Sequence, residues 1–134
     1  MNCIASYKDD VKVIFENGKS VRFKNVSKTT YQIGKIDGCL ITDHRKRCDY
    51  FLRTREKIWL VELKGKNVDH AIEQIVQTTH NLTEEISDRT IIAVIIASKC
   101  PAISGIQKSL LGFKKCNKRP SDIVLKSRMA DIDI

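Results

Sequence analysis

Two apolar segments decide the fold of this chain: Cys48-Asp49-Tyr50-Phe51-Leu52 and Ile58-Trp59-Leu60-Val61-Glu62-Leu63-Lys64-Gly65. The polar stretch between them, residues 53–57, predicts a β-hairpin. If Arg55 and Glu56 form its two-residue turn, Asp49 lies directly opposite Glu62 on the neighbouring strand. Directly opposed residues have Cβ atoms roughly 4.5–5.5 Å apart, and two carboxylates that close repel each other unless a cation lies between them. The hairpin therefore predicts a divalent metal site.

A lysine is expected beside that site. Residues i and i+2 of a strand point to the same face, so Glu62 and Lys64 should project together and Leu63 away from them. Glu and Lys at this spacing are common on solvated strand faces. Here, however, residues 58–61 are apolar on both faces of the strand. A strand buried on both faces carries charge only where the charge is paired or used, which favours a functional site.

Beyond Gly65 the apolar period changes from 2 to 3.6. The spacing predicts an amphipathic helix over residues 68–87, with Asn67 as its N-cap. The β-branched run over residues 91–97 is apolar on both faces and predicts a central strand parallel to the strand that ends at Gly65.

The remaining segments give weaker patterns. Residues 11–16 and 20–26 predict a hairpin around Asn17-Gly18, and residues 36–42 predict a further strand that carries Asp37 and Gly38. Residues 103–113 suggest a short helix and residues 122–127 a last strand. Residues 129–134 are expected to form a tail.

Asp49, then Glu62-Leu63-Lys64 after twelve intervening residues, then an amphipathic helix resembles the core of the PD-(D/E)XK nuclease superfamily. The resemblance covers roughly residues 36–97. It implies a single α/β domain over residues 1–134, with a restriction-endonuclease-like mixed central β-sheet and flanking helices. It also implies an endonuclease that hydrolyses phosphodiester bonds, most often in DNA, with Mg²⁺ or Mn²⁺ as its cofactor.

The resemblance assigns roles to the hairpin residues. Asp49 and Glu62 are expected to hold the metal, with the backbone carbonyl of Leu63 as a third oxygen ligand. Mg²⁺ prefers oxygen ligands and uses one or two carboxylates together with water and substrate phosphate. Lys64 is expected to orient or deprotonate the attacking water. Asp49, Glu62 and Lys64 are therefore the predicted catalytic residues.

Other polar residues are possible accessories. Asp37 could supply the extra acid that many superfamily members carry on a helix before the first strand. Gln74 lies on the predicted helix, where related nucleases often place a polar residue near the site. Glu16 and His70 are weaker candidates for a role in the site. The histidines share no metal-ligand spacing, so a zinc hydrolase is not supported.

The chain carries a formal net charge of +8, which favours a polyanionic partner. The predicted nucleic-acid contacts are Arg45, Lys46, Arg47, Lys66, Lys114 and Lys115. DNA is the expected partner. Two alternatives stay open: a nuclease-fold protein that binds nucleic acid or a protein partner without cutting, and an RNA-cleaving toxin domain. Since no target-recognition domain is evident, the chain should recognise nucleic-acid structure, form a homodimer or act in a larger complex.

The composition also indicates the expected location of the protein. No apolar run approaches the roughly 20 residues of a membrane span, and the N-terminus lacks a secretory pattern, so we expect no membrane partner and a cytoplasmic location. The five cysteines form no CxxC pair, and a cytosolic chain is not expected to carry disulfides. Cys39 and Cys48 are expected to be small core residues within strands.

Overall fold

A computed structural model of the protein describes residues 2–65, 67–99, 111 and 121–134, and of residues 64, 65 and 121 it describes the backbone alone. The larger sheet consists of β1 (Ile4–Tyr7), β4 (Tyr31–Lys35), β5 (Tyr50–Arg53), β6 (Lys57–Gly65), β7 (Thr90–Ala97) and β8 (Ser121–Ser127), in that spatial order. The smaller sheet consists of β2 (Val11–Glu16), β3 (Lys19–Lys24) and β9 (Met129–Asp133). The helices are α1 (Val68–Asn81) and α2 (Thr83–Ile86).

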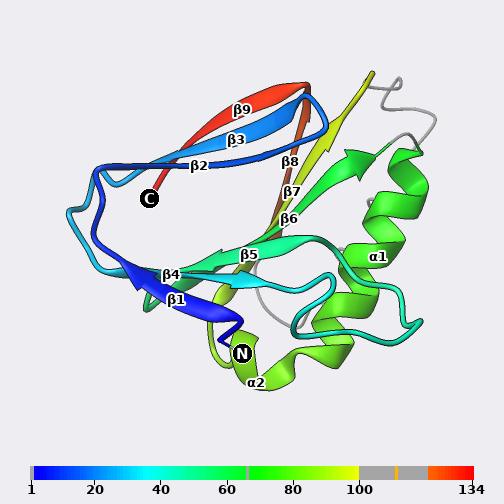
Figure 1. Ribbon diagram of the computed structural model, residues 1–134, viewed down its shortest axis with the longest axis horizontal. Coiled ribbons are helices and arrows are strands. Elements are labelled where there is room, and N and C mark those ends of the chain that lie inside the picture. The colour runs from blue at the N-terminus through cyan, green and yellow to red at the C-terminus, as the bar shows by residue number, and fades with distance from the viewer. Residues whose placement is uncertain (1, 66, 100–110, 112–120) are drawn as a thin grey trace.

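The larger sheet is mixed. Strands β1, β4, β5 and β6 pair antiparallel, whereas β6, β7 and β8 pair parallel. Helix α1 covers one face and the smaller sheet lies against the other (Figure 1). The mixed α/β fold predicted from the sequence is thus confirmed, although strands dominate it. The predicted helix over residues 103–113 lies, but for Leu111, outside the described residues.

Two apolar layers form because side chains alternate along the central strands. From β6, Ile58 and Leu60 point toward α1, where Ile75 lies. Trp59 and Val61 point toward the smaller sheet. Each of these side chains is buried. Burial of each large apolar side chain stabilises the fold by roughly 1.5–3 kcal/mol. Burial on both faces therefore fixes β6 in the centre of the protein.

Helix α1 begins as its sequence predicts. The Asn67 side chain accepts a hydrogen bond of 3.2 Å from the His70 backbone N–H, which caps the helix. The predicted single helix over residues 68–87 is nevertheless interrupted at Leu82, whose φ and ψ of −115° and 45° are not helical. Helix α2 follows as a separate turn.

Two predictions about strands are wrong. The segment 36–42 is a turn and not a strand: Gly38 has a φ of 80°, and the Ile41 N–H donates to the Ile36 carbonyl at 2.9 Å. The strand lies earlier, at β4. Residues 129–134 are not a tail, because β9 pairs parallel with β3 and every second residue of this segment is buried: Ala130, Ile132 and Ile134.

Candidate functional site

The β5–β6 hairpin brings Asp49 and Glu62 to one pocket. Tyr50 pairs with Val61, and the Asp49 N–H donates to the same Val61 carbonyl at 3.0 Å, so the regular register of the two strands ends at Tyr50 and Val61. The pairing of β5 with β6 confirms the predicted hairpin, whereas the predicted direct opposition of Asp49 and Glu62 lies beyond the paired residues. Asp49 is 4% exposed and Glu62 is 2% exposed. Burying a carboxylate is costly unless polar groups or a cation compensate it. Asp49 accepts a hydrogen bond from the Leu63 N–H, and Glu62 also has an interaction partner.

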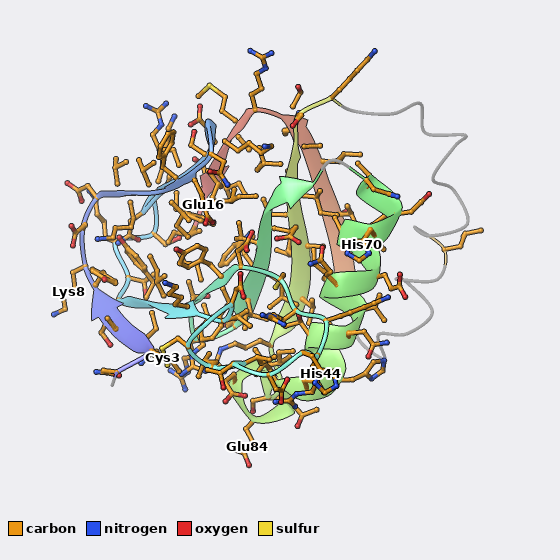
Figure 2. All side chains as sticks on the ribbon, turned by 45° about the vertical axis from the view of Figure 1, so that its right-hand side comes forward. Cys3, Lys8, Glu16, His44, His70 and Glu84 are labelled. Carbon is orange, nitrogen blue, oxygen red and sulfur yellow. A yellow bond between two sulfur atoms is a disulfide. The ribbon has the colours of Figure 1, made fainter. Side chains whose placement is uncertain are left out.

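A pocket of about 360 Å³ lies over the pair. Its acidic lining residues are Asp37, Asp49 and Glu62, the loop before β5 contributes residues 44–47, and α1 contributes His70 and Gln74. Figure 2 shows His70 on α1 and His44 near the helix in this view. The structure therefore brings together two of the three predicted metal ligands, Asp49 and Glu62, both predicted accessory residues and the first basic cluster, whereas Leu63 does not line the pocket.

A second pocket, of about 260 Å³, adjoins the first, because Asp37 and Asp49 line both. It adds Lys35, Tyr50 and, from the end of β2, Glu16. Glu16 comes from the smaller sheet. Its position shows that both sheets contribute carboxylates around Asp49. The sequence did not indicate this, because Glu16 and Asp49 are far apart along the chain.

Asp49 is oriented by the partner strand. Its Oδ2 accepts a hydrogen bond of 2.9 Å from the buried Leu63 N–H, which fixes the carboxylate across the hairpin. The Leu63 side chain is fully buried in the core, so only its backbone can take part in binding. The predicted use of the Leu63 carbonyl is compatible with this arrangement.

A β-bulge follows Glu62. Glu62 pairs with Ile95 and Gly65 pairs with Ala97, so β6 has one residue more than β7 over this interval. Leu63 and Lys64 accordingly have no partner residue on β7. Lys64 belongs to β6 by its backbone, and its side chain lies outside the described residues. Because the extra residue interrupts the alternation, the i, i+2 spacing alone does not fix the face of Lys64.

Helix α1 holds the three residues that precede Asp49. Lys46 Nζ lies 2.7 Å from Glu73 Oε1, and Gln74 Nε2 donates to the Arg47 carbonyl at 3.2 Å. The Cys48 N–H donates to Thr78 Oγ1 at 2.9 Å, and that hydroxyl donates in turn to the Gln74 carbonyl at 2.8 Å. The site is thus connected to α1 residue by residue.

Thr78 is a positioning residue that the sequence analysis missed. It is fully buried, and it lies four residues after Gln74 and three after the core residue Ile75. A polar residue at i+3 from a core position falls on the buried face of a helix, and a buried hydroxyl needs a partner. The spacing of Thr78 from Ile75 could therefore have identified Thr78, from the sequence alone, as a buried residue that needs a hydrogen-bond partner.

The predicted basic cluster pairs with carboxylates. Arg45 Nε lies 3.0 Å from both carboxylate oxygens of Asp43, and Arg47 lies 3.0 Å from Asp37 Oδ1. Arg47 also donates to the carbonyls of Asp43 and Arg45, both at 2.8 Å. Hydrogen bonds from the backbone N–H and side chain of Arg45 lower the pKa of Asp43. These contacts fold the loop onto itself and onto the turn that carries Asp37.

The other predicted phosphate contacts, Lys66, Lys114 and Lys115, lie outside the described residues. Lys46 donates to Glu73 on α1, and this hydrogen bond lowers the pKa of the Glu73 carboxyl. All three loop cations, Arg45, Lys46 and Arg47, are therefore engaged by carboxylates other than Asp49 and Glu62.

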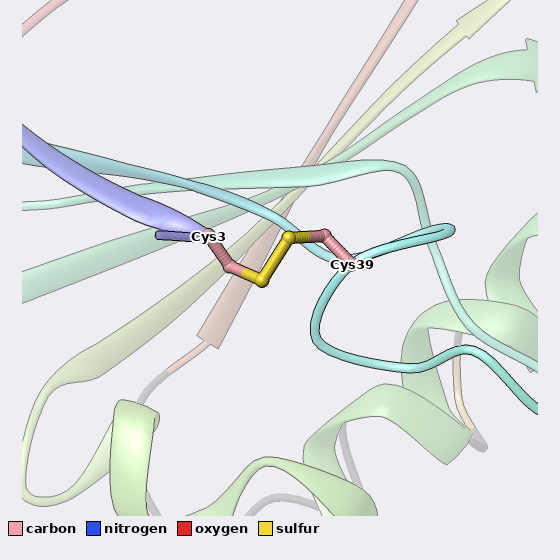
Figure 3. Close-up of a disulfide and its surroundings, with 2 residues drawn as sticks. All are labelled: Cys3 and Cys39. Atoms are coloured by element: carbon pink, nitrogen blue, oxygen red, sulfur yellow. A yellow bond between two sulfur atoms is a disulfide. The ribbon is translucent and has the colours of Figure 1, made fainter. Parts of the chain in front are cut away.

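The turn that carries Asp37 is held by a disulfide between Cys3 and Cys39 (Figure 3). The prediction that the cysteines stay unpaired is therefore wrong for these two, and Cys39 is a half-buried turn residue rather than a core residue of a strand. Their separation of 36 residues gave no signal in the sequence. The fold brings them together because the Lys35 N–H donates to the Cys3 carbonyl at 2.9 Å.

Cys48 is the core residue that was predicted. It is fully buried, and burial is the main cause that raises the pKa of its thiol far above the ordinary value. The thiol therefore stays protonated at neutral pH and is not a nucleophile.

The donor set around Asp49 contains oxygen ligands. Within the described ranges, no group of three or more His, Cys, Asp or Glu side chains is arranged to hold a metal ion. Mg²⁺ needs fewer protein ligands, because it retains water and is commonly held by one or two carboxylates. Two buried carboxylates that line a pocket of about 360 Å³ fit that requirement. Asp49 and Glu62 are the residues that would hold the ion.

Comparison with protein-family models, with curated proteins and with solved structures found no match to this chain. No helix in the described part of the chain is long and apolar enough to cross a membrane. The function is therefore argued from the residues of the site.

Proposed function

We propose that this protein is a divalent-metal-dependent nuclease that hydrolyses phosphodiester bonds in DNA. The observation that carries the proposal is that two buried carboxylates, Asp49 and Glu62, line one open pocket. Ionisable groups buried in a pocket are more frequent at functional sites than elsewhere in a protein.

The order of elements supports the same proposal. An antiparallel meander of β4, β5 and β6 is followed by α1 and then by β7, which is parallel to β6. This is the arrangement expected for a restriction-endonuclease-like core. Glu62 lies on its third strand and Asp49 directly before its second, close to the positions that the PD-(D/E)XK resemblance implies.

Each residue has a part in the proposed reaction. A divalent ion, when bound, supplies positive charge that stabilises the transferring phosphoryl group and lowers the pKa of water. Asp49, fixed by the Leu63 N–H, and Glu62 bind that ion. Lys64 would orient the attacking water, or accept its proton while the amine is neutral, the form that a neighbouring divalent ion favours. Gln74 keeps the backbone before Asp49 in place through the Arg47 carbonyl.

A second candidate is a module that binds nucleic acid without cutting it. One observation favours it: the described side chains include no three-residue metal-ligating group. In such a module, Asp49 and Glu62 would not catalyse cleavage, and the basic residues alone would bind the nucleic acid.

Cleavage assays separate the two candidates. Supercoiled plasmid, linear duplex, single-stranded DNA and RNA are incubated with the protein in Mg²⁺, in Mn²⁺ and in EDTA. The nuclease should cut at least one DNA substrate with metal and none with EDTA, whereas the binding module cuts nothing. Glu62→Gln and Asp49→Asn should each slow cleavage by about 100-fold or more, as expected when a group that stabilises the transition state is removed.

The matched control is Glu84→Gln, because Glu84 is exposed on α2 and makes no contact with the pocket (Figure 2). It removes the same charge and should leave the rate unchanged. Wild-type cleavage by Glu62→Gln would overturn the proposed site, and cleavage of RNA alone would reassign the substrate.

A further inference from the structure

A third pocket, of about 270 Å³, lies where β7 ends and where two turns of the chain meet. The β2–β3 turn contributes Asn17, Gly18 and Lys19, the residue after β7 contributes Ser98, and the β8–β9 turn contributes Arg128. Two of these side chains are cationic and none is acidic. The described lining of the pocket is therefore positively charged.

Backbone hydrogen bonds hold this pocket rigidly. The Arg128 N–H donates to the Ala97 carbonyl at the end of β7, and the Arg128 carbonyl accepts from the Ser20 N–H at the start of β3, both at 3.0 Å. Arg128 itself has a φ of 67°, a left-handed conformation that a non-glycine residue adopts at a specific turn. Both sheets thus fix the backbone from which the arginine projects.

Lys19 and Arg128 form no ion pair with a described carboxylate, although Glu16 lies opposite Lys19 in the β2–β3 register. Among residues 2–65, 67–99, 111 and 121–134, no carboxylate oxygen lies within 4.0 Å of either cation. The loop cations Arg45, Lys46 and Arg47, in contrast, each have such a partner. Cations that converge on a pocket without a carboxylate favour an anionic ligand. Asn17 and Ser98 add neutral side chains that can donate hydrogen bonds.

The third pocket lies next to the proposed active site. Glu16 lines the pocket that contains Asp49, and Asn17, the next residue, lines the cationic pocket. The β2–β3 turn, the β8–β9 turn and the ends of β6 and β7 gather at one edge of the protein (Figure 1). In the view of Figure 2, Glu16 and His70 lie on either side of the end of β6.

A nucleic-acid strand presents phosphates at short, regular intervals, with one charge per roughly 3.4 Å of axis on each strand. A strand that has one phosphodiester at Asp49 and Glu62 and runs toward the β2–β3 turn presents further phosphates along that path. Lys19 and Arg128 line the pocket at this turn and can meet a phosphate without first breaking an ion pair, as Lys35 can beside Asp49.

We propose that Lys19 and Arg128 form a binding site for a backbone phosphate of the nucleic-acid strand whose neighbouring phosphodiester lies at Asp49 and Glu62. The placement of the strand rests on the proposed function, whereas the phosphate site itself does not. Arg45 and Arg47 then have a different role from the predicted one, because they brace the loop of the active site.

The test is binding measured by fluorescence anisotropy in EDTA, so that no cleavage occurs. A labelled duplex and a labelled single strand are titrated with protein at several salt concentrations. The test variant combines Lys19→Gln with Arg128→Asn, since asparagine tolerates a left-handed backbone. The matched control combines Lys8→Gln with Arg55→Asn, two exposed cations without a carboxylate partner in the described part of the chain. Both variants lose two positive charges.

Two lost phosphate contacts should reduce the slope of log affinity against log salt by about 1.8 for duplex DNA, and lower affinity by roughly 30-fold at 0.15 M salt. The control should stay within about threefold of the wild type. Equal binding by the two variants would overturn the proposal, as would a steeper loss in the control. A third variant, Lys19→Gln alone, leaves the β8–β9 turn intact and should lose about half of the slope change.

This outcome is separable from that of the proposed function. If no metal supports cleavage and the slope difference remains, the phosphate site stands and the nuclease proposal fails. If cleavage is seen and the two variants bind alike, the nuclease proposal stands and the phosphate site is wrong.

Discussion

Thr78→Val tests whether α1 positions the residues before Asp49. The Thr78 hydroxyl is fully buried and accepts the Cys48 N–H at 2.9 Å. Valine has nearly the same shape but no hydroxyl, so the substitution leaves that buried N–H without its acceptor. A buried donor left unsatisfied costs about 1–3 kcal/mol. We therefore expect the free energy of unfolding to fall by about 2 kcal/mol.

Urea denaturation measures this loss. With an m-value of about 2 kcal/mol/M, a loss of about 2 kcal/mol lowers the midpoint by about 1 M. The matched control is Thr79→Val, one residue further along α1. The Thr79 hydroxyl donates only to the Val76 carbonyl within the helix, at 2.6 Å, and is half-buried. Its removal should change the free energy of unfolding by less than about 0.5 kcal/mol.

The site supplies a second readout. Loss of the Cys48 contact frees the chain next to Asp49, so Thr78→Val should slow cleavage under conditions where it is fully folded, and Thr79→Val should not. Equal urea midpoints for the two valine variants would refute the reasoning, because they would show that the Cys48 N–H is not held by Thr78.

Two further predictions concern packing and the disulfide. A Cβ at Gly34 would overlap the ring of Phe51, which is fully buried, so Gly34→Ala should lower the free energy of unfolding by about 1–3 kcal/mol. Adding Phe51→Leu should recover part of that loss in urea denaturation, and no recovery would show that the ring is not the obstacle. Cys39→Ser opens the cross-link between residues 36 apart, which should cost about 4 kcal/mol in chain entropy. The wild type should lose a similar amount in reductant, and an unchanged midpoint there would argue against the disulfide.

The central part of the fold could be predicted because its patterns are local. The alternation of Trp59 and Val61 with Ile58 and Leu60 identified a strand buried on both faces, and the two-residue turn then fixed its register with the preceding strand. The hairpin, together with the alternation along β6, brought Asp49 and Glu62 to one pocket. Hairpins and a long amphipathic helix carry their own signals, because the residues that pair are close in sequence.

The outer strands could not be predicted in the same way. Strand β9 pairs parallel with β3 across more than a hundred residues, so nothing near Ala130 and Ile132 indicates the partner. The pattern of alternate apolar residues is present there, but it is short and is interrupted by aspartates. The turn at residues 36–41 was mistaken for a strand because its apolar residues face the core from a turn held by Gly38.

The partners of charged residues are the least predictable part of the site. Arg45, Lys46 and Arg47 read as a basic patch, yet their carboxylate partners come from the same loop, from α1 and from the turn at Asp37. Composition gives the number of charges, and only the fold determines which of them are balanced.

The ion pairs around the two pockets agree with the two proposed roles, which are metal binding at Asp49 and Glu62 and phosphate binding at Lys19 and Arg128. Around the first pocket, the loop cations are engaged by carboxylates other than Asp49 and Glu62, so the loop does not provide the neutralising charge for this buried pair. In the proposed nuclease, a divalent ion would supply positive charge to this pair. Across the β2–β3 turn, Lys19 and Arg128 form no ion pair with a described carboxylate, although Glu16 lies opposite Lys19. If both proposals hold, one edge of the sheet would offer carboxylates for a metal and, across the turn, cations for a further phosphate, which is the order of charges that a nucleic-acid backbone requires.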